Sequence, residues 1–236
     1  SLLEYINLQA ELLQLQANPK GKTEGFVIEA QLEPDMGPTA HLLVRRGTLS
    51  VGDTIVCGSH WAKIKALVND QGKKIQKAGP SIPAKCLGLS GVPEAGASFE
   101  VVADPKTAKS VVEDRIQTNR GQSQQAPNRN TSLEDLLSAT APGETLELPT
   151  IIKADVQGSV EALQLALQEI SSEKISLKFV ATSVGNITAN DVLLASASNA
   201  IILGFHVTVE NDAVSFAKKE GVEIRLYNII YELVDE

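Results

Sequence analysis

The chain has 236 residues, of which 43% are hydrophobic and 21% charged, values typical of a folded globular protein rather than a disordered or collagen-like one. This length allows one large domain or two small ones, because domains usually hold roughly 100–200 residues. The formal net charge of −8 argues against a nucleic-acid partner only if the charge is evenly spread. It is not, because residues 1–130 hold 15 basic and 13 acidic residues, whereas residues 131–236 hold 6 and 16. This asymmetry predicts two units with different partners.

No apolar run approaches the roughly 20 residues that a membrane helix needs. Residues 1–5 have no basic region before an apolar stretch, so no signal peptide is visible. The two cysteines, Cys57 and Cys86, cannot form a disulfide framework. We therefore expect buried free thiols and a cytoplasmic protein without a membrane partner.

The first half of the chain reads as a β unit. After a short helical stretch at 1–12, residues 13–103 hold short runs of strand-forming residues separated by glycine and proline. These runs lie at 25–32, 40–45, 54–57, 61–68, 84–89 and 98–102. Several short strands separated by turn residues favour a sandwich or a small barrel.

A helix and a linker are predicted at 104–130. Asp104 is a preferred helix N-cap and Pro105 fits the first helical position, so a helix of about four turns begins there. Residues 121–130 are polar and lack apolar periodicity, and we expect a linker or mobile loop.

The second half, 131–228, alternates strand and helix signals. Strands are predicted at 148–156, 175–184, 200–203 and 222–227, and helices at 159–170, after Thr188 and at 211–219. This alternation indicates a three-layer α/β domain with a mainly parallel four-stranded sheet, and the wholly apolar third strand is typical of its centre. Residues 229–236 look like the start of a further helix.

Few residues form a catalytic or cofactor motif. The Gly21-Lys22-Thr23 triplet imitates the end of a phosphate-binding P-loop, but the required earlier glycine is absent and a β-like run follows, so we expect a turn. Gly158 and Ser159 at a strand-to-helix turn could either hold an anion or form a plain helix cap.

The candidate metal and acid–base residues are equally sparse. His41, His60 and His206 do not lie at ligand spacing from one another or from a cysteine, so no metal site is expected. Asp155 and Asp191 could form a carboxylate pair, or Asp191 could simply stabilise a helix start. We expect no catalytic, cofactor-binding or metal-binding residues.

Basic residues in the first half form the most informative set. Lys63 and Lys65 alternate with an apolar residue in one predicted strand, so both point to one face. Trp61 begins the same strand, and a lysine face beside an aromatic suits contact with RNA; a solvated strand edge guarded by lysines is the alternative. The candidate rRNA-contacting residues are Arg45, Arg46, Lys63, Lys65, Lys73, Lys74 and Lys77.

Long motifs resemble bacterial-type translation initiation factor two, a family of translational GTPases. In the second half these are PTIIKADVQGSVEAL (149–163), GNIT (185–188), DVLLASASNAII (191–202), GF (204–205), GV (221–222), IR (224–225) and YNIIY (227–231). In the first half they are LQAE (8–11), GTL (47–49), VGD (51–53), AGPS (78–81) and GLSGVPEAG (88–96).

The resemblance implies an interior fragment: a β-barrel second domain and an α/β third domain of a longer factor. A GTP-binding domain with GTP and magnesium would precede residue 1, so that 1–12 would be its end, and an initiator-tRNA-binding domain would follow residue 236. The fragment would dock the factor, as a monomer, on the ribosomal subunits (rRNA and proteins). It would relay the nucleotide state toward the domain that binds formyl-methionyl initiator tRNA, without being an enzyme itself.

A second interpretation comes from another class of protein. A metabolite-binding protein or an enzyme would use the carboxyl ends of the parallel strands as its crevice. Residues near Gly158, Gly185 and Gly204 would then line the site.

Overall fold

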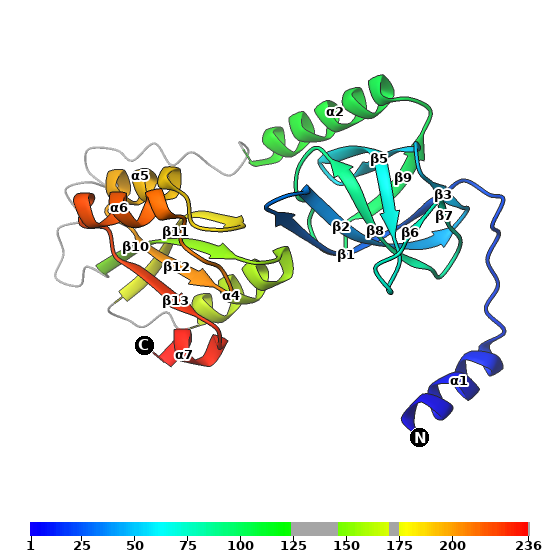
Figure 1. Ribbon diagram of the computed structural model, residues 1–236, viewed down its shortest axis with the longest axis horizontal. Helices are drawn as coiled ribbons and strands as arrows, with labels where there is room; N and C mark the ends of the chain where they lie inside the picture. Colours follow the sequence, from blue (N-terminus) through cyan, green and yellow to red (C-terminus); the bar gives the residue numbers. More distant parts are fainter. Residues whose placement is uncertain (124–145, 170–174, 236) are drawn as a thin grey trace.

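The first domain is a closed antiparallel barrel. The computed structural model describes residues 1–123, 146–169 and 175–235 of the chain, and two domains are evident in it (Figure 1). Six strands close in the order β4-β9-β1-β2-β8-β5, because β4 also pairs with β5, and β6 extends the sheet beyond β5. The strands are β1 (Glu24–Glu33), β2 (Gly37–Arg46), β4 (Thr54–Cys57), β5 (His60–Val68), β6 (Lys74–Ile75), β8 (Pro83–Leu89) and β9 (Ser98–Val102). A separate two-stranded ribbon joins β3 (Leu49–Ser50) to β7 (Lys77–Ala78).

An aliphatic core holds the barrel closed. Along β2, buried residues such as Leu42 and Val44 alternate with exposed ones, as expected when one face of a strand meets a core. Phe99 is the one aromatic side chain among the fully buried residues of this core. Both cysteines also lie within it and are free and buried, as predicted.

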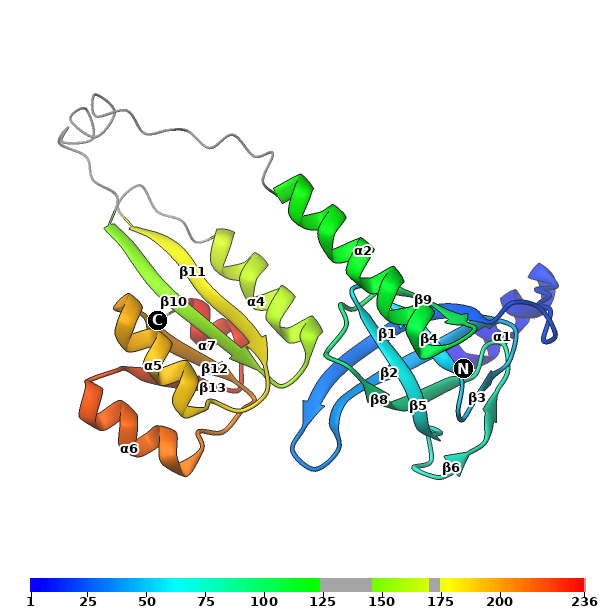
Figure 2. The same cartoon turned by 90° about the horizontal axis from the view of Figure 1, so that it is seen from above.

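Helix α2 (Pro105–Ser123) covers part of the outer surface of the barrel (Figure 2). Two backbone N–H groups of its first turn donate to the Asp104 carboxylate at 2.8 Å, which confirms the predicted N-cap. Ala108 and Val112 pack with Val56 in a small satellite core. The helix continues through 121–123, so it includes the first three residues of the predicted linker, and the rest of that linker lies outside the described residues.

The second domain is a three-layer α/β unit, as predicted. Its parallel sheet has the order β11-β10-β12-β13, so the apolar β12 (Ile201–Phe205) is an inner strand. The other strands are β10 (Leu146–Ala154), β11 (Ile175–Val184) and β13 (Ile224–Tyr227). The helices are α4 (Gln157–Glu169), α5 (Ala189–Ser198), α6 (Asn211–Glu220) and α7 (Ile230–Asp235).

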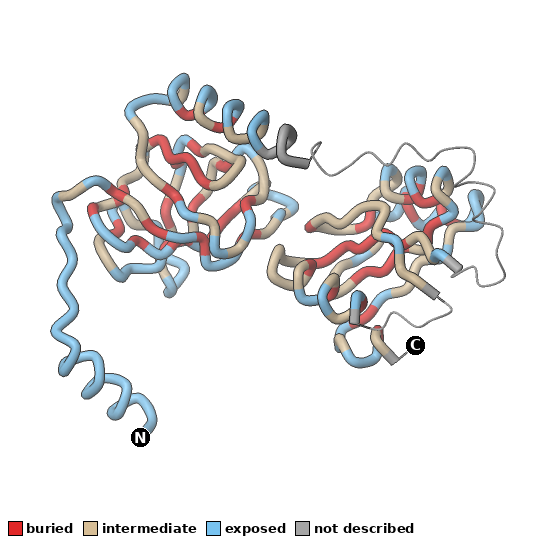
Figure 3. The backbone as a smooth tube through the Cα atoms, turned by 180° about the vertical axis from the view of Figure 1, so that it is seen from behind, coloured by how far each residue is buried: buried red, intermediate tan, exposed pale blue. Residues whose placement is uncertain are grey.

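Separate apolar clusters fill the two faces of this sheet. Side chains of α4 and α7 pack on one face and those of α5 and α6 on the other. Figure 3 shows the buried strands as the interior of each domain. Two buried clusters on one sheet account for the apolar runs that indicated a parallel sheet covered on both sides.

The tip of the β1–β2 hairpin touches the second domain. Gln31 and Val156 form an isolated antiparallel bridge. A Cβ built on Gly185 would lie 3.2 Å from a methyl carbon of Leu32, so Leu32 lies against the end of β11. The barrel hairpin therefore occupies the edge of the sheet where its parallel strands end.

Helix α1 (Leu2–Leu13) stands away from the barrel, and none of its residues is buried (Figures 1 and 3). It coincides with the helical stretch expected at 1–12. The predicted domain boundaries at 13, 104, 131 and 229 stay predictions, because the secondary structure alone does not decide where one folding unit ends.

Candidate nucleic-acid interface

The outer face of β5 carries two lysines, as the alternation predicted. Lys63 and Lys65 are exposed, whereas Ile64 between them is buried. Within the described part of the chain, neither ammonium group has an ion-pair partner. Asp53, close in sequence to β5, accepts the backbone N–H of Ser50 at 2.8 Å and so stabilises its own turn. Two unpaired cations are thus available to an anionic partner.

A bulge next to Gly88 sets the direction of this part of β5. The register with β8 shifts between Ala62 and Ala66. Gly88 has a positive φ of 109°, and a Cβ on it would lie 2.4 Å from the carbonyl oxygen of Lys63. A side chain at this position would therefore push the two strands apart, and only glycine allows the close approach.

Register extends the basic surface onto neighbouring strands. Val68 of β5 lies opposite Lys74 of β6 and also opposite Lys85 of β8. The bulge shifts the alternation, so that Leu67 is buried and Val68 faces outward. Directly opposed residues share a face of the sheet, so Lys74 lies on the same outer face as Lys63 and Lys65. We call Lys63, Lys65 and Lys74 the lysine face.

Lys85, which was not among the predicted residues, lies beside the lysine face but is neutralised. Its ammonium group pairs with the Glu33 carboxylate, which also accepts hydrogen bonds from Thr39 and Gln31 at 2.8 Å. Burial acts to raise the pKa of Glu33, but these hydrogen bonds together hold it below its usual value. Sequence alone gave no signal for this network, because its members come from three strands.

Trp61 does not join the lysine face, contrary to the prediction that an aromatic neighbour would be available to RNA. Its side chain packs with Val56 and with residues of α2, and Lys109 of that helix lies 5.3 Å from the ring centroid. The ring is on the same side of β5 as the lysines, but α2 folds back over it. The Trp61 ring therefore contacts residues of α2 and is not available to an RNA ligand.

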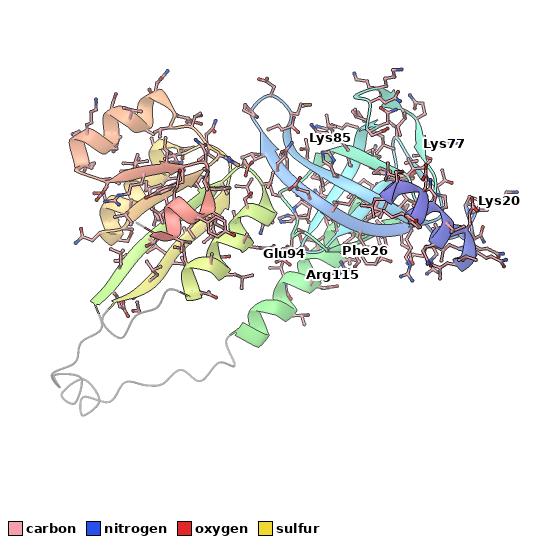
Figure 4. All side chains as sticks on the ribbon, turned by 90° about the horizontal axis from the view of Figure 1, so that it is seen from below. Lys20, Phe26, Lys77, Lys85, Glu94 and Arg115 are labelled. Atoms are coloured by element: carbon pink, nitrogen blue, oxygen red, sulfur yellow. The ribbon has the colours of Figure 1, made fainter. Side chains whose placement is uncertain are left out.

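The remaining predicted residues lie at other places on the barrel. Arg46 forms an ion pair with Glu24 at 2.8 Å. Lys73 and Lys77 are exposed at the turn and ribbon end of the barrel, and Figure 4 shows Lys77 there, far from Phe26. The seven candidates therefore do not form a single patch.

Arg45 belongs to a second surface, around Phe26 of β1. The Arg45 guanidinium carbon lies 6.0 Å from the centroid of the Phe26 ring, and that residue is 41% exposed. A cavity of about 290 Å³ opens beside them, and Arg115 of α2 lines it too. Figure 4 shows Phe26 and Arg115 next to each other on the side of the barrel nearest α2.

The carboxyl end of the parallel sheet, where the alternative interpretation placed a crevice, is filled by protein at Gly185 and Gly204, whereas the space beside Gly158 is open. Leu32 of the barrel lies against Gly185. A Cβ on Gly204 would lie 2.6 Å from Leu226, so side chains already fill that position. Gly158 lies in the first turn of α4 and is not its cap.

The polar residues at this edge are paired with one another. Asp191 caps α5 by accepting the Thr188 N–H at 2.8 Å, and it pairs with the buried Lys153 at 3.2 Å. Asp155 instead lies 3.6 Å from His206. Each of the two carboxylates thus has its own partner, and the helix-start interpretation of Asp191 is confirmed.

The P-loop-like triplet has none of the geometry of a phosphate site. Lys22 pairs with Glu100 at 2.5 Å, and the Thr23 hydroxyl donates to the Thr48 carbonyl at 3.1 Å. A strand follows where a P-loop needs a helix. These residues do not fit the phosphates of GTP or their magnesium ion.

Two features are absent from the part of the chain that the structure describes. There, no group of three or more His, Cys, Asp or Glu residues is placed to hold a metal ion. No helix in the same ranges has the length and apolar character to cross a membrane.

Comparisons with known proteins agree with both domains. The family described as elongation factor G domain 2 matches residues 22–102, and the family described as translation-initiation factor 2 matches residues 122–236. The barrel is therefore similar to the second domain of elongation factor G, and the α/β domain is similar to translation-initiation factor 2.

Individual relatives agree with these family matches. The chain is 48% identical to translation initiation factor IF-2 of Clostridium botulinum over 235 residues, covering 100% of this chain and 34% of that protein. It is also 48% identical to IF-2 of Acetivibrio thermocellus, with 23% of that protein covered. The resemblance to bacterial translation initiation factor 2 is thus confirmed over the whole chain, which spans about a quarter to a third of the length of these relatives.

A solved structure supports the fold. The crystal structure of GDP-bound aIF5B from Aeropyrum pernix matches 98% of this chain and 39% of that chain with a TM-score of 0.52 at 19% identity. At that identity the match concerns the fold only.

Proposed function

We propose that this chain is the docking and relay part of a translation initiation factor. The lysine face is the observation that carries the docking role: three exposed lysines on one outer surface, two of them on a single strand, in a chain whose net charge is −8. Cations that pair with phosphates release counterions and so favour binding to a ribosomal RNA backbone. The acidic second domain then serves as spacer and relay.

The same proposal assigns nucleotide binding and initiator-tRNA binding to other parts of the longer factor. GTP and magnesium would be held by a separate domain, and the formyl-methionyl initiator tRNA by another. Consistent with this, the chain itself would be a cytoplasmic, non-catalytic monomer. The relatives' greater length supports this division, because the chain covers only 34% of the first of them.

The hairpin contact supports a relay. A relay needs an element with two distinct arrangements, whose balance is shifted both by the nucleotide and by the tRNA-binding domain. The contact between the two domains, where Leu32 lies against Gly185, is the candidate for this element. In the longer factor, Leu32→Asp should leave ribosome affinity intact but reduce its dependence on the bound nucleotide. An unchanged nucleotide dependence would contradict the relay.

Docking is tested by reversing two charges. The variant Lys63→Glu/Lys65→Glu should bind purified ribosomal subunits at least tenfold more weakly in a sedimentation assay. The matched control, Lys218→Glu/Lys219→Glu, makes the same charge change in exposed residues at the end of α6. Equal binding by the lysine-face variant and the wild-type chain, or equal weakening by both variants, would refute docking through this face.

A further inference from the structure

The cavity beside Phe26 contains the groups that an unpaired nucleobase needs. Phe26 lies directly opposite Ser98 on β9 and Leu43 on β2, so these three outward side chains form a row across three strands. Leu43 is 37% exposed and so continues the apolar surface beside the ring. The ring is thus a flat, accessible platform with a hydroxyl group on one side.

At Gly25, which lines this cavity, strand β1 lies very close to its neighbours β2 and β9. A Cβ on Gly25 would lie 2.0 Å from the Leu43 carbonyl oxygen and 2.6 Å from a ring carbon of Phe99. No other residue fits at Gly25, which is buried against the Leu43 carbonyl and the Phe99 ring.

Charges around the cavity favour an anionic ligand. Two carboxylates line it and both are already paired: Glu24 with Arg46, and Glu100 with Lys22 and Arg115. Arg45 has no carboxylate partner among the described residues, and its guanidinium lies over the Phe26 ring, 6.0 Å from the ring centroid. A phosphate beside a stacked base would meet this free guanidinium.

The size of the cavity restricts the ligand. Its volume of about 290 Å³ lies just below the range for small-molecule sites, which is about 300–1,000 Å³, so the ligand must be small. An exposed aromatic ring with an arginine is the arrangement on which single-stranded nucleic acids stack their bases.

From this geometry we infer that the Phe26 cavity binds one unpaired RNA nucleotide, with its base on Phe26 and its phosphate at Arg45. This site lies on a different surface from the lysine face, which binds backbone phosphates only. The inference rests on the proposed function in one respect, namely that the partner is RNA.

Mapping with a mononucleotide tests the site directly. In the ¹⁵N-labelled chain, 5′-AMP should shift the amide resonances of Gly25, Phe26 and Ser98. The Lys63→Glu/Lys65→Glu variant should show the same shifts, so failure of the lysine-face docking and failure of this site can be told apart. Shifts that are absent at these three amides, or that gather elsewhere, would overturn the inference.

Affinity for a single strand provides the second test. Phe26→Leu keeps an apolar side chain but removes the stacking surface, and should weaken binding of a fluorescent oligoadenylate decamer about tenfold. Tyr231→Leu is the matched control, since Tyr231 is an exposed aromatic residue, at 75%, in α7. The Trp61 emission spectrum verifies that each variant is folded, and equal affinity of Phe26→Leu and the wild-type chain would refute the stacking role.

Discussion

Cys57 and Cys86 are both enclosed by the barrel core, and burial raises the pKa of each thiol to about 12. Reaction with a disulfide reagent requires the thiolate, which is scarce at such a pKa. Near pH 8, the folded chain should therefore react at least about a hundredfold more slowly than the chain in denaturant. Release of thionitrobenzoate measures both rates, and rapid reaction of either thiol in the folded chain would contradict a closed core.

Glu33 links the hairpin to β8, and its low pKa gives a stability that depends on pH. A carboxyl group whose pKa is lower in the folded than in the unfolded state stabilises the fold above the unfolded value, and that stability is lost as the pH falls through the folded value. Glu33→Gln should therefore cost about 1 kcal/mol at pH 7. This difference should shrink as the pH falls below about 4.5, the value for an unperturbed glutamate.

Urea unfolding at pH 7 and pH 4 measures this effect. Glu29→Gln is the control, because Glu29 is exposed on the same strand and has no ion-pair partner among the described residues. A destabilisation by Glu33→Gln that is equal at both pH values would show that the carboxylate charge is irrelevant.

At the scale of elements, helix α2 determines which part of the outer face of β5 is exposed to solvent. The helix covers Trp61 and Val56 and leaves the lysines further along the strand uncovered. Val112 of α2 is only 7% exposed, so Val112→Ala removes buried methyl groups and should destabilise the barrel by about 1–2 kcal/mol.

The single tryptophan reports this loss. Urea unfolding followed by Trp61 emission should show a lower midpoint for Val112→Ala, and Ser110→Ala, an exposed change in the same helix, should stay within about 0.5 kcal/mol of the wild-type chain. No effect of Val112→Ala would mean that α2 does not pack on the barrel in solution.

The strands and helices were largely predictable because their signals are local. The run at 54–57 and the capping pattern at Thr188 are periodic or chemical features of neighbouring residues, and both elements are found where predicted. The position of α2 over Trp61 was not predictable, since the alternation in β5 says which side a residue faces but not what lies above it. For the same reason the basic residues could not be divided into two surfaces before the strand register was known.

For the whole molecule, the proposal places GTP binding in another domain of the longer factor, so the isolated chain should neither bind nor hydrolyse GTP. Lys22, the one lysine in a P-loop-like triplet, is engaged by Glu100. We expect no heat of binding when GTP with magnesium is titrated into the chain, and no release of phosphate. Tight binding of GTP would contradict the assignment of nucleotide binding to another domain.

The net charge of −8 conceals the two surfaces of the barrel. The lysine face and the Phe26 cavity lie in the half of the chain with a slight basic excess, and the α/β domain carries the acidic excess. An acidic chain can therefore still dock on RNA, provided that its cations are grouped on one domain.

The salt dependence of ribosome binding tests the central claim most directly. For the wild-type chain, the logarithm of the subunit association constant should fall linearly with the logarithm of the salt concentration. Each phosphate that a lysine neutralises contributes about 0.7–0.9 to the slope, so Lys63→Gln/Lys65→Gln should reduce the slope by about 1.4–1.8. A slope near zero for the wild-type chain, or an unchanged slope for this variant, would contradict docking through the lysine face.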